Sequence, residues 1–168
     1  MVRSLGVVVL IAGALVLLAP RADRAPVTVV DYRPQLAVAR SEAPYPVLGP
    51  AGLPADWRST SVRLRGASGV TTWHIGFVTP DDEYAAVEQS DGPAAAFVRD
   101  VTGQGRPAGS VELAGQTWQR YDPGDADQRS LVRPAVSGGG SPDAASVVVT
   151  GSAEWAELET LARSLRAG

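Results

Sequence analysis

The only histidine of this sequence, His74, is the side chain best suited to acid–base chemistry. Any serine triad or histidine general base must therefore use it. His74 falls in the middle of a predicted strand, residues 71–79, where a structural, hydrogen-bonded role is favoured over catalysis. No G-x-S-x-G motif accompanies it, and Gly151-Ser152 is better explained as a strand end followed by a helix N-cap. An envelope hydrolase that uses His74 with nearby carboxylates is the alternative to a non-enzymatic protein.

Three acidic residues at short spacing, Asp122, Asp125 and Asp127, superficially resemble a calcium-binding loop. They lack the EF-hand spacing and its distal glutamate, so a solvated acidic loop is the better interpretation. The sequence contains no cysteine, which excludes disulfides, zinc–thiolate sites, a lipoprotein anchor and a cysteine nucleophile. We predict no metal and no cofactor.

The glycine-rich stretch Gly138–Gly140 precedes a predicted strand, whereas a phosphate-binding loop precedes a helix and carries a lysine. There is no lysine in the chain, and all 15 basic residues are arginine, as is typical of a high-GC genome. The net charge of −3 also differs in sign from that of most nucleic-acid-binding modules. We therefore expect no nucleic-acid partner.

Aromatic side chains are the heaviest groups available for a core, because the chain has four tryptophans and only two phenylalanines. Core packing is the default for each of them. The residues that remain candidates for an interaction surface or a pocket are Trp57, His74, Tyr84 and Trp118. Trp57 is the strongest of these, since it ends a proline-rich loop over residues 44–57.

An apolar run without charge occupies residues 5–19 and ends at Pro20. A membrane-spanning helix needs about 20 apolar residues, whereas a secretory signal has a shorter core and a small-x-small cleavage site. The alanines that follow offer no good cleavage site. We therefore predict a membrane anchor (or uncleaved signal) over residues 1–20, which enters the cytoplasmic membrane through residues 4–20. A cleaved leader that releases a secreted soluble protein is the alternative.

Behind this anchor, residues 21–26 read as a linker and residues 27–168 as one domain. The positive-inside rule hardly discriminates the two orientations, because arginines flank the apolar run on both sides. A short hydrophobic start followed by a single folded domain is the usual arrangement of an exported protein. We therefore place the domain outside the cytoplasmic membrane, as the C-terminal part of a single-pass protein.

Strand patterns dominate the domain. Apolar and polar residues alternate over residues 59–65 and 71–79, and residues 84–90 return as the partner strand, which predicts an antiparallel meander. Residues 27–32 are rich in β-branched side chains and predict another strand. The continuous valines of residues 146–150 predict a central strand that is buried on both faces.

Helices are expected over residues 34–43 and 94–101, and after Ser152, where an apolar stripe recurs at helical spacing. Ala114-Gly115 fits a two-residue hairpin turn. The predicted fold class is α+β: an antiparallel sheet of about six to eight strands with about three helices packed mainly on one face.

Four ordered motifs make the sequence specific: APYPVLGPAGLPADWRSTSVR, TWHIGFVTPDDEYAAVEQSDG, TWQRYD and VVVTGSAEWAELETLARSL. With them the chain resembles an actinobacterial family of single-pass membrane proteins that is described as a domain of unknown function, number 4245. The resemblance covers nearly the whole chain. It implies a high-GC Gram-positive host and an N-terminal membrane segment ahead of an extracytoplasmic domain, and it supplies neither an activity nor site residues.

These observations lead to one expectation about function. The chain should be a membrane-tethered, non-enzymatic binding or interaction module of the cell envelope. Its partner would be an unidentified protein or an envelope ligand.

Overall fold

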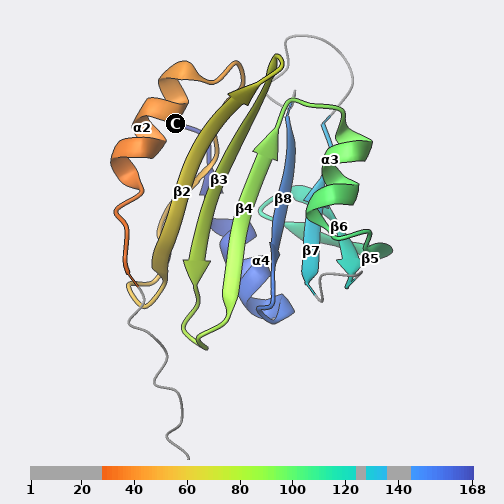
Figure 1. Ribbon diagram of the computed structural model, residues 1–168. Coiled ribbons are helices and arrows are strands. Elements are labelled where there is room, and N and C mark those ends of the chain that lie inside the picture. The colour runs from red at the N-terminus through yellow and green to blue at the C-terminus, as the bar shows by residue number, and fades with distance from the viewer. Residues whose placement is uncertain (1–27, 124–127, 136–144) are drawn as a thin grey trace, which may run out of the picture.

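The computed structural model describes residues 28–123, 128–135 and 145–168, which form an α+β domain (Figure 1). Three helices accompany a seven-stranded antiparallel sheet with the order β2-β3-β4-β8-β7-β6-β5. The strands of this sheet are β2 (Arg58–Ala67), β3 (Val70–Val78), β4 (Tyr84–Ser90), β5 (Arg106–Leu113), β6 (Gln116–Asp122), β7 (Arg129–Arg133) and β8 (Ser146–Gly151). The helices are α2 (Arg33–Glu42), α3 (Ala94–Val101) and α4 (Trp155–Ser164). A separate pair joins β1 (Gly49–Pro50) to β9 (Leu165–Arg166). The α+β class and the number of strands are confirmed.

Two meanders meet at the centre of the sheet. The first, β2-β3-β4, leads through α3 to the second, β5-β6-β7, and β8 then inserts between β4 and β7. All six residues of β8 are buried, which confirms the prediction of a central strand covered on both faces.

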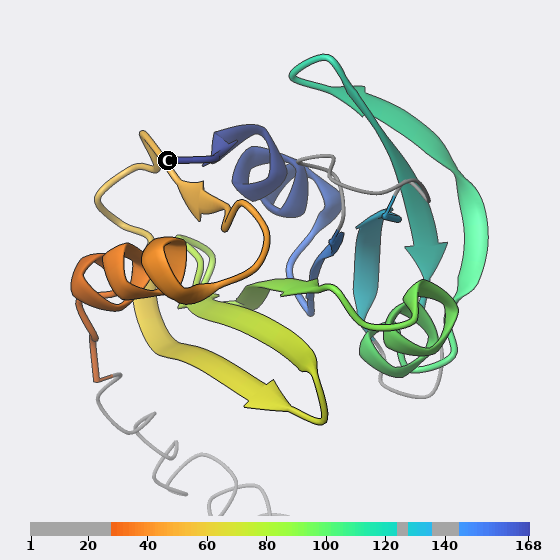
Figure 2. The same cartoon turned by 90° about the horizontal axis from the view of Figure 1, so that it is seen from above.

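The helices lie on both sides of the sheet. Figure 2 shows α2 and α4 on one side and α3 on the other. The main core lies on the side of α2 and α4, where Trp73 and Phe77 of β3 pack in one cluster with Leu158 of α4. A smaller cluster under α3 joins Val98 to Val148. Two of the three described helices therefore share one face of the sheet, and α3 covers an apolar patch on the opposite face.

The predicted strand over residues 27–32 is not formed in its described part, residues 28–32. There the backbone amide of Val30 donates one hydrogen bond to the carbonyl of Ser59, 2.8 Å long. The register of β2 shifts between Ser59 and Ser61, and such a bulge interrupts the regular edge that a neighbouring strand would need.

Ser152 was expected to cap the last helix, and this prediction is wrong. Helix α4 begins at Trp155, with Glu154 as the N-cap residue and no side-chain cap. The Ser152 hydroxyl instead accepts a hydrogen bond from the Tyr84 amide (3.1 Å) and donates one to the Glu83 carboxylate (2.6 Å). It therefore ties the start of β4 to the end of β8.

The predicted anchor (residues 1–20) and linker (residues 21–26) lie outside the described residues, as do Asp125, Asp127 and Gly138–Gly140. Within the part of the chain that the structure describes, no helix is long and apolar enough to cross a bilayer.

Candidate functional sites

His74 is the centre of a hydrogen-bonded chain across three neighbouring strands. Its Nε2 lies 2.8 Å from the Ser61 hydroxyl on β2, and its Nδ1 lies 2.5 Å from a carboxylate oxygen of Glu88 on β4. The ladder explains the arrangement, because His74 pairs with Glu88 across β3 and β4 while Ser61 pairs with Gly76, two residues further along β3. These three hydrogen-bonded side chains lie on the same side of the sheet as α3, where Glu88 pairs with Val148 of the smaller cluster.

Gly76 has no side chain, and two hydroxyl groups occupy the place that a side chain would take. A Cβ atom at Gly76 would lie 2.5 Å from the Ser61 hydroxyl oxygen and 3.1 Å from the Tyr84 hydroxyl oxygen. Real Cβ atoms do not approach another atom so closely, so a side chain cannot be placed here without displacing one of the two hydroxyls. Glycine therefore lets the Ser61 and Tyr84 hydroxyls approach one point on the sheet.

Opposite charges surround the Tyr84 phenol. Burial and the Glu88 carboxylate raise the pKa of Tyr84, whereas the Arg63 guanidinium acts to lower it. The net direction is upward, so this hydroxyl is protonated and able to donate a hydrogen bond at neutral pH.

A small hollow of about 200 Å³ lies beside His74. It is lined by Arg63, Arg65, Thr72, His74 and Glu88. Arg63 pairs with His74 in the ladder between β2 and β3, and both arginines are exposed. The open part of this face thus presents two guanidinium groups next to the serine–histidine–glutamate chain, an arrangement that favours anionic ligands.

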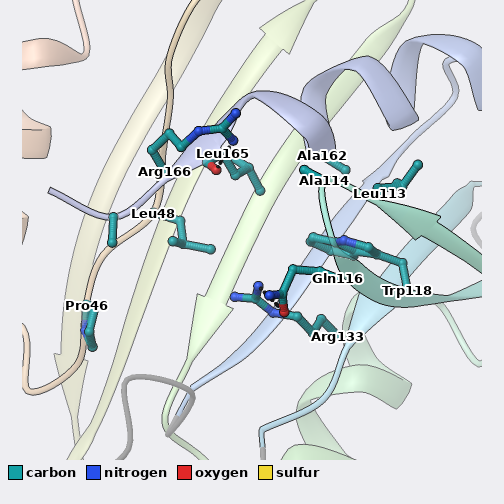
Figure 3. Close-up of a pocket in the computed structure, with 11 residues that line it drawn as sticks. Pro46, Leu48, Leu113, Ala114, Gln116, Trp118, Arg133, Ala162, Leu165 and Arg166 are labelled. Atoms are coloured by element: carbon teal, nitrogen blue, oxygen red, sulfur yellow. Dashed lines mark hydrogen bonds between the residues drawn. The ribbon is translucent and has the colours of Figure 1, made fainter.

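A second, larger pocket of about 470 Å³ lies on the opposite side of the sheet (Figure 3). Four parts of the chain surround it: the segment before β1, the hairpin of β5 and β6, strand β7, and the end of α4. The lining residues are Pro46, Leu48, Leu113, Ala114, Gln116, Trp118, Arg133, Ala162, Leu165, Arg166 and Ala167.

Two arginines give this pocket its charge. The Arg133 guanidinium stands over the Trp118 ring, 5.5 Å from the centroid, and donates a hydrogen bond to the Gln116 side-chain oxygen (3.4 Å). Arg166 donates to the carbonyls of Arg163 (2.8 Å) and Leu165 (2.7 Å) and is exposed. No carboxylate lines the pocket among the residues that the structure describes.

The four candidates from the sequence fall in three places. His74 and Tyr84 share the site on the α3 side, and Trp118 lines the pocket on the other side. Trp57 is buried in the main core, where its ring meets Phe77 edge-on at 6.1 Å, and it lines neither site.

Metal binding has no support within the described ranges, which contain no group of three or more ligating side chains placed to hold an ion. Asp122 is exposed at the end of β6.

The family described as "Protein of unknown function (DUF4245)" matches the chain over residues 1–165. The chain belongs to the DUF4245 family. No curated protein and no solved structure matches it. Both sites of this DUF4245 protein lie almost wholly inside the matched range, and only Arg166 and Ala167 fall beyond it.

Sequence reasoning missed functional candidates in this DUF4245 domain, among them Ser61, Arg63, Gly76, Glu88 and Arg133. The alternation over residues 59–65 already placed Ser61 and Arg63 on one face, but only the register of the β3–β4 hairpin brings Glu88 opposite His74. Gly76 had no sequence signal, since its role depends on two hydroxyls from other strands. Arg133 has none either, because the pocket joins segments that are distant in sequence.

Proposed function

We propose that this DUF4245 protein is a binding module of the cell envelope. Residues 4–20 would tether it to the cytoplasmic membrane of an actinobacterial cell as a single-pass protein, with the domain outside. The charge-free run of residues 5–19 supports the tether. The domain itself is a folded unit of sheet and helices, and the pocket of about 470 Å³ beside Trp118 has room for a small ligand.

The pocket of about 470 Å³ in Figure 3 is called the Trp118 pocket below. The binding role rests on the cationic and apolar groups that lie together in this pocket. Arg133 and Arg166 supply positive charge, while Leu48, Leu113 and Leu165 supply apolar wall. A ligand that contacts both the arginines and the leucines has one acidic group joined to an apolar portion. The ligand class is therefore a small anionic amphiphile, either a carboxylate or a phosphate ester.

The test of the ligand class compares molecules of one shape and different charge. Calorimetric titration of the full chain in lipid nanodiscs, with empty nanodiscs as the blank, would use 3-phenylpropionate, 3-phenylpropyl phosphate and neutral 3-phenylpropanol. At least one anion should bind about tenfold or more tightly than the alcohol, the difference expected of one charged hydrogen bond. Equal binding of the alcohol would contradict the role of the arginines, and the two anions separate carboxylate from phosphate.

A matched pair of variants locates the site. Arg166→Gln should weaken binding of the preferred anion about tenfold. Arg99→Gln is the control, because Arg99 is an exposed arginine of α3 that pairs with Asp100 on the other side of the sheet. Loss of binding in both variants would point to a general effect of charge.

Tethering and orientation have their own test. A fluorescent fusion of the full chain should fractionate with the cell envelope, and a fusion that lacks residues 1–26 should not. Added protease should degrade the domain in intact spheroplasts. An N-terminus cut after the apolar run, measured by mass spectrometry, would instead favour the secreted form.

A further inference from the structure

The serine–histidine–glutamate chain on the α3 side of the sheet has the atom order of an activated nucleophile. The Glu88 carboxylate meets Nδ1 of His74, and the Ser61 hydroxyl meets Nε2. A carboxylate on Nδ1 fixes the ring so that Nε2 is the basic nitrogen, and it stabilises the imidazolium that forms when Nε2 takes a proton. This geometry goes beyond ligand binding and lies on the opposite side of the sheet from the Trp118 pocket.

We propose that Ser61 is the nucleophile of an ester-hydrolysing site, with His74 as its general base and Glu88 as the positioning residue of His74. The substrate class is a carboxylic ester that carries a second, anionic group.

The position of Ser61 supports its role as the nucleophile. The register of β2 shifts between Ser59 and Ser61, so Ser61 directly follows a bulge, a feature that redirects side chains and recurs beside active sites. Ser61 is partly exposed, whereas His74 beneath it is only 7 % exposed. Substrate therefore reaches the Ser61 hydroxyl before the His74 ring.

Tyr84 supplies the donor for the oxyanion. Its hydroxyl oxygen and that of Ser61 lie 3.1 and 2.5 Å from the point where a Gly76 Cβ would stand. Both hydroxyls therefore lie beside the same glycine, and the negative charge that develops on an ester carbonyl oxygen when Ser61 attacks falls close to the Tyr84 O–H. Hydrogen-bond donors placed where that charge develops are a principal source of catalysis in acyl transfer.

Arg63 indicates the charge of the substrate. It stands opposite His74 in the ladder and lines the hollow of about 200 Å³ beside the ring. A guanidinium in this position binds a carboxylate or phosphate a short distance from the scissile ester.

The reaction balances without a metal or redox partner. Ser61 Oγ forms a bond to the ester carbonyl carbon while its proton moves to Nε2 of His74. The ester C–O bond then breaks, and the leaving alcohol takes that proton. Water repeats the sequence on the acyl-serine: its proton passes to His74, its oxygen bonds to carbon, and Ser61 leaves with the proton, so that the acid is released.

The first test is covalent labelling of the full chain in nanodiscs with a fluorophosphonate probe. Peptide mass spectrometry should map the adduct to Ser61, and Ser61→Ala should not carry it. Ser41→Ala is the matched control, because Ser41 is an exposed serine of α2 whose hydroxyl donates a hydrogen bond to the Val38 carbonyl of the same helix. Absence of an adduct at Ser61 in the folded wild-type chain overturns the proposal, whatever the variants do.

The second test measures turnover of 4-nitrophenyl hemisuccinate, which is anionic, against 4-nitrophenyl acetate. The wild-type chain should hydrolyse the anionic ester faster, and Arg63→Gln should remove that preference. Ser61→Ala and His74→Gln should lower kcat/KM about 100-fold or more. Wild-type turnover no faster than that of Ser61→Ala overturns the proposal.

A third test must distinguish a role of Glu88 in positioning His74 from a role in stabilising the fold. Glu88→Gln should lower kcat about tenfold or more with little change in KM, and Glu88→Asp should restore part of the loss. Equal kcat in Glu88→Gln and the wild type, with both folded by circular dichroism, would remove Glu88 from the proposed site.

Discussion

Leu48 and Gln89 are joined by a hydrogen bond of 3.0 Å from the backbone amide of Leu48 to the side-chain oxygen of Gln89. The side-chain nitrogen of Gln89 donates in turn to the carbonyl of Pro46 (2.8 Å). The Leu48 carbonyl accepts a bond from the Trp73 indole (3.1 Å). Proline has no amide hydrogen to donate, so the proline-rich segment before β1 cannot form a regular ladder. Side chains of β3 and β4 instead supply hydrogen-bond partners for its backbone.

Replacement of Gln89 should therefore destabilise the domain. Gln89 is 2 % exposed, so Gln89→Leu would leave the buried Leu48 amide without a partner and would also remove the hydrogen bond to the Pro46 carbonyl. We expect a loss of about 2–4 kcal/mol in the free energy of unfolding, measured by urea denaturation with tryptophan fluorescence. Gln35→Leu on the exposed side of α2 is the control and should change it by less than about 0.5 kcal/mol. Similar effects of the two variants would contradict the role of Gln89.

Helices, strands and turns were predicted well from the sequence where a pattern of neighbouring residues is enough to determine them. The valines of β8 identified a central strand, and Ala114-Gly115 identified a hairpin, which forms with both residues at positive φ. Ser152 shows the limit of such rules. It has the chemistry of an N-cap, yet its hydroxyl serves the Tyr84 amide and the Glu83 carboxylate, a contact that only the tertiary structure creates.

The candidate sites were less predictable for a related reason. His74 stood out as the single histidine, but its partners come from β2 and β4 through a register that no local pattern fixes. Sequence reasoning also favoured Trp57 over Trp118 as a residue of an interaction surface or pocket. Both tryptophans are buried in the main core, and Trp118 also lines a pocket because β6, β7 and the end of α4 meet beside it.

Tyr45 should make the domain sensitive to alkaline pH. Burial, with a smaller effect of Asp91, raises the pKa of Tyr45, and its hydroxyl donates to the carbonyls of Gln89 and Thr71 at 3.2 Å each. Below about pH 10 both the folded and the unfolded chain keep this proton, so the full stability is present. Above about pH 10 the unfolded chain releases it first, and the free energy of unfolding falls by up to about 1.4 kcal/mol per pH unit.

The Tyr45→Phe variant tests this dependence. It removes the titrating group, so its stability should fall less steeply between about pH 10 and 11.5, although it starts about 1 kcal/mol lower from the lost hydrogen bonds. Urea denaturation at a series of pH values measures both slopes. Parallel curves for the wild type and the variant would show that Tyr45 does not control the alkaline limit.

Gly151 should tolerate no side chain, because it ends β8 where β4 begins. A Cβ at this position would lie 1.9 Å from the Tyr84 carbonyl oxygen and 2.9 Å from the Ala85 Cα. Both are backbone atoms that cannot move without breaking the β4–β8 ladder. Gly151→Ala should therefore lower the free energy of unfolding by about 3 kcal/mol or more. Gly66→Ala is the control: nothing lies within 4 Å of its Cβ position, so its effect should stay below about 1 kcal/mol.

Glu159 should hold α4 against β6 through charge. Its carboxylate binds Arg120 of β6 and, at 2.8 Å, Arg163 one turn along α4, and its side chain is only 13 % exposed. The Arg120 guanidinium also lies over the Trp155 ring, 5.1 Å from the centroid. Removal of the carboxylate would leave Arg120 partly buried without its counter-charge.

We therefore expect Glu159→Gln to lower the free energy of unfolding by about 1–3 kcal/mol. Asp100→Asn is the matched control, because Asp100 pairs with Arg99 at the surface, where both side chains are more than 60 % exposed. Exposed pairs contribute little, so this variant should cost less than about 1 kcal/mol. Added salt should narrow the difference between Asp100→Asn and the wild type more than that between Glu159→Gln and the wild type, since solvent screens the exposed pair more strongly. A Glu159→Gln protein as stable as the wild type in urea denaturation would mean that packing of Trp155 and Leu158, and not this carboxylate, holds α4 in place.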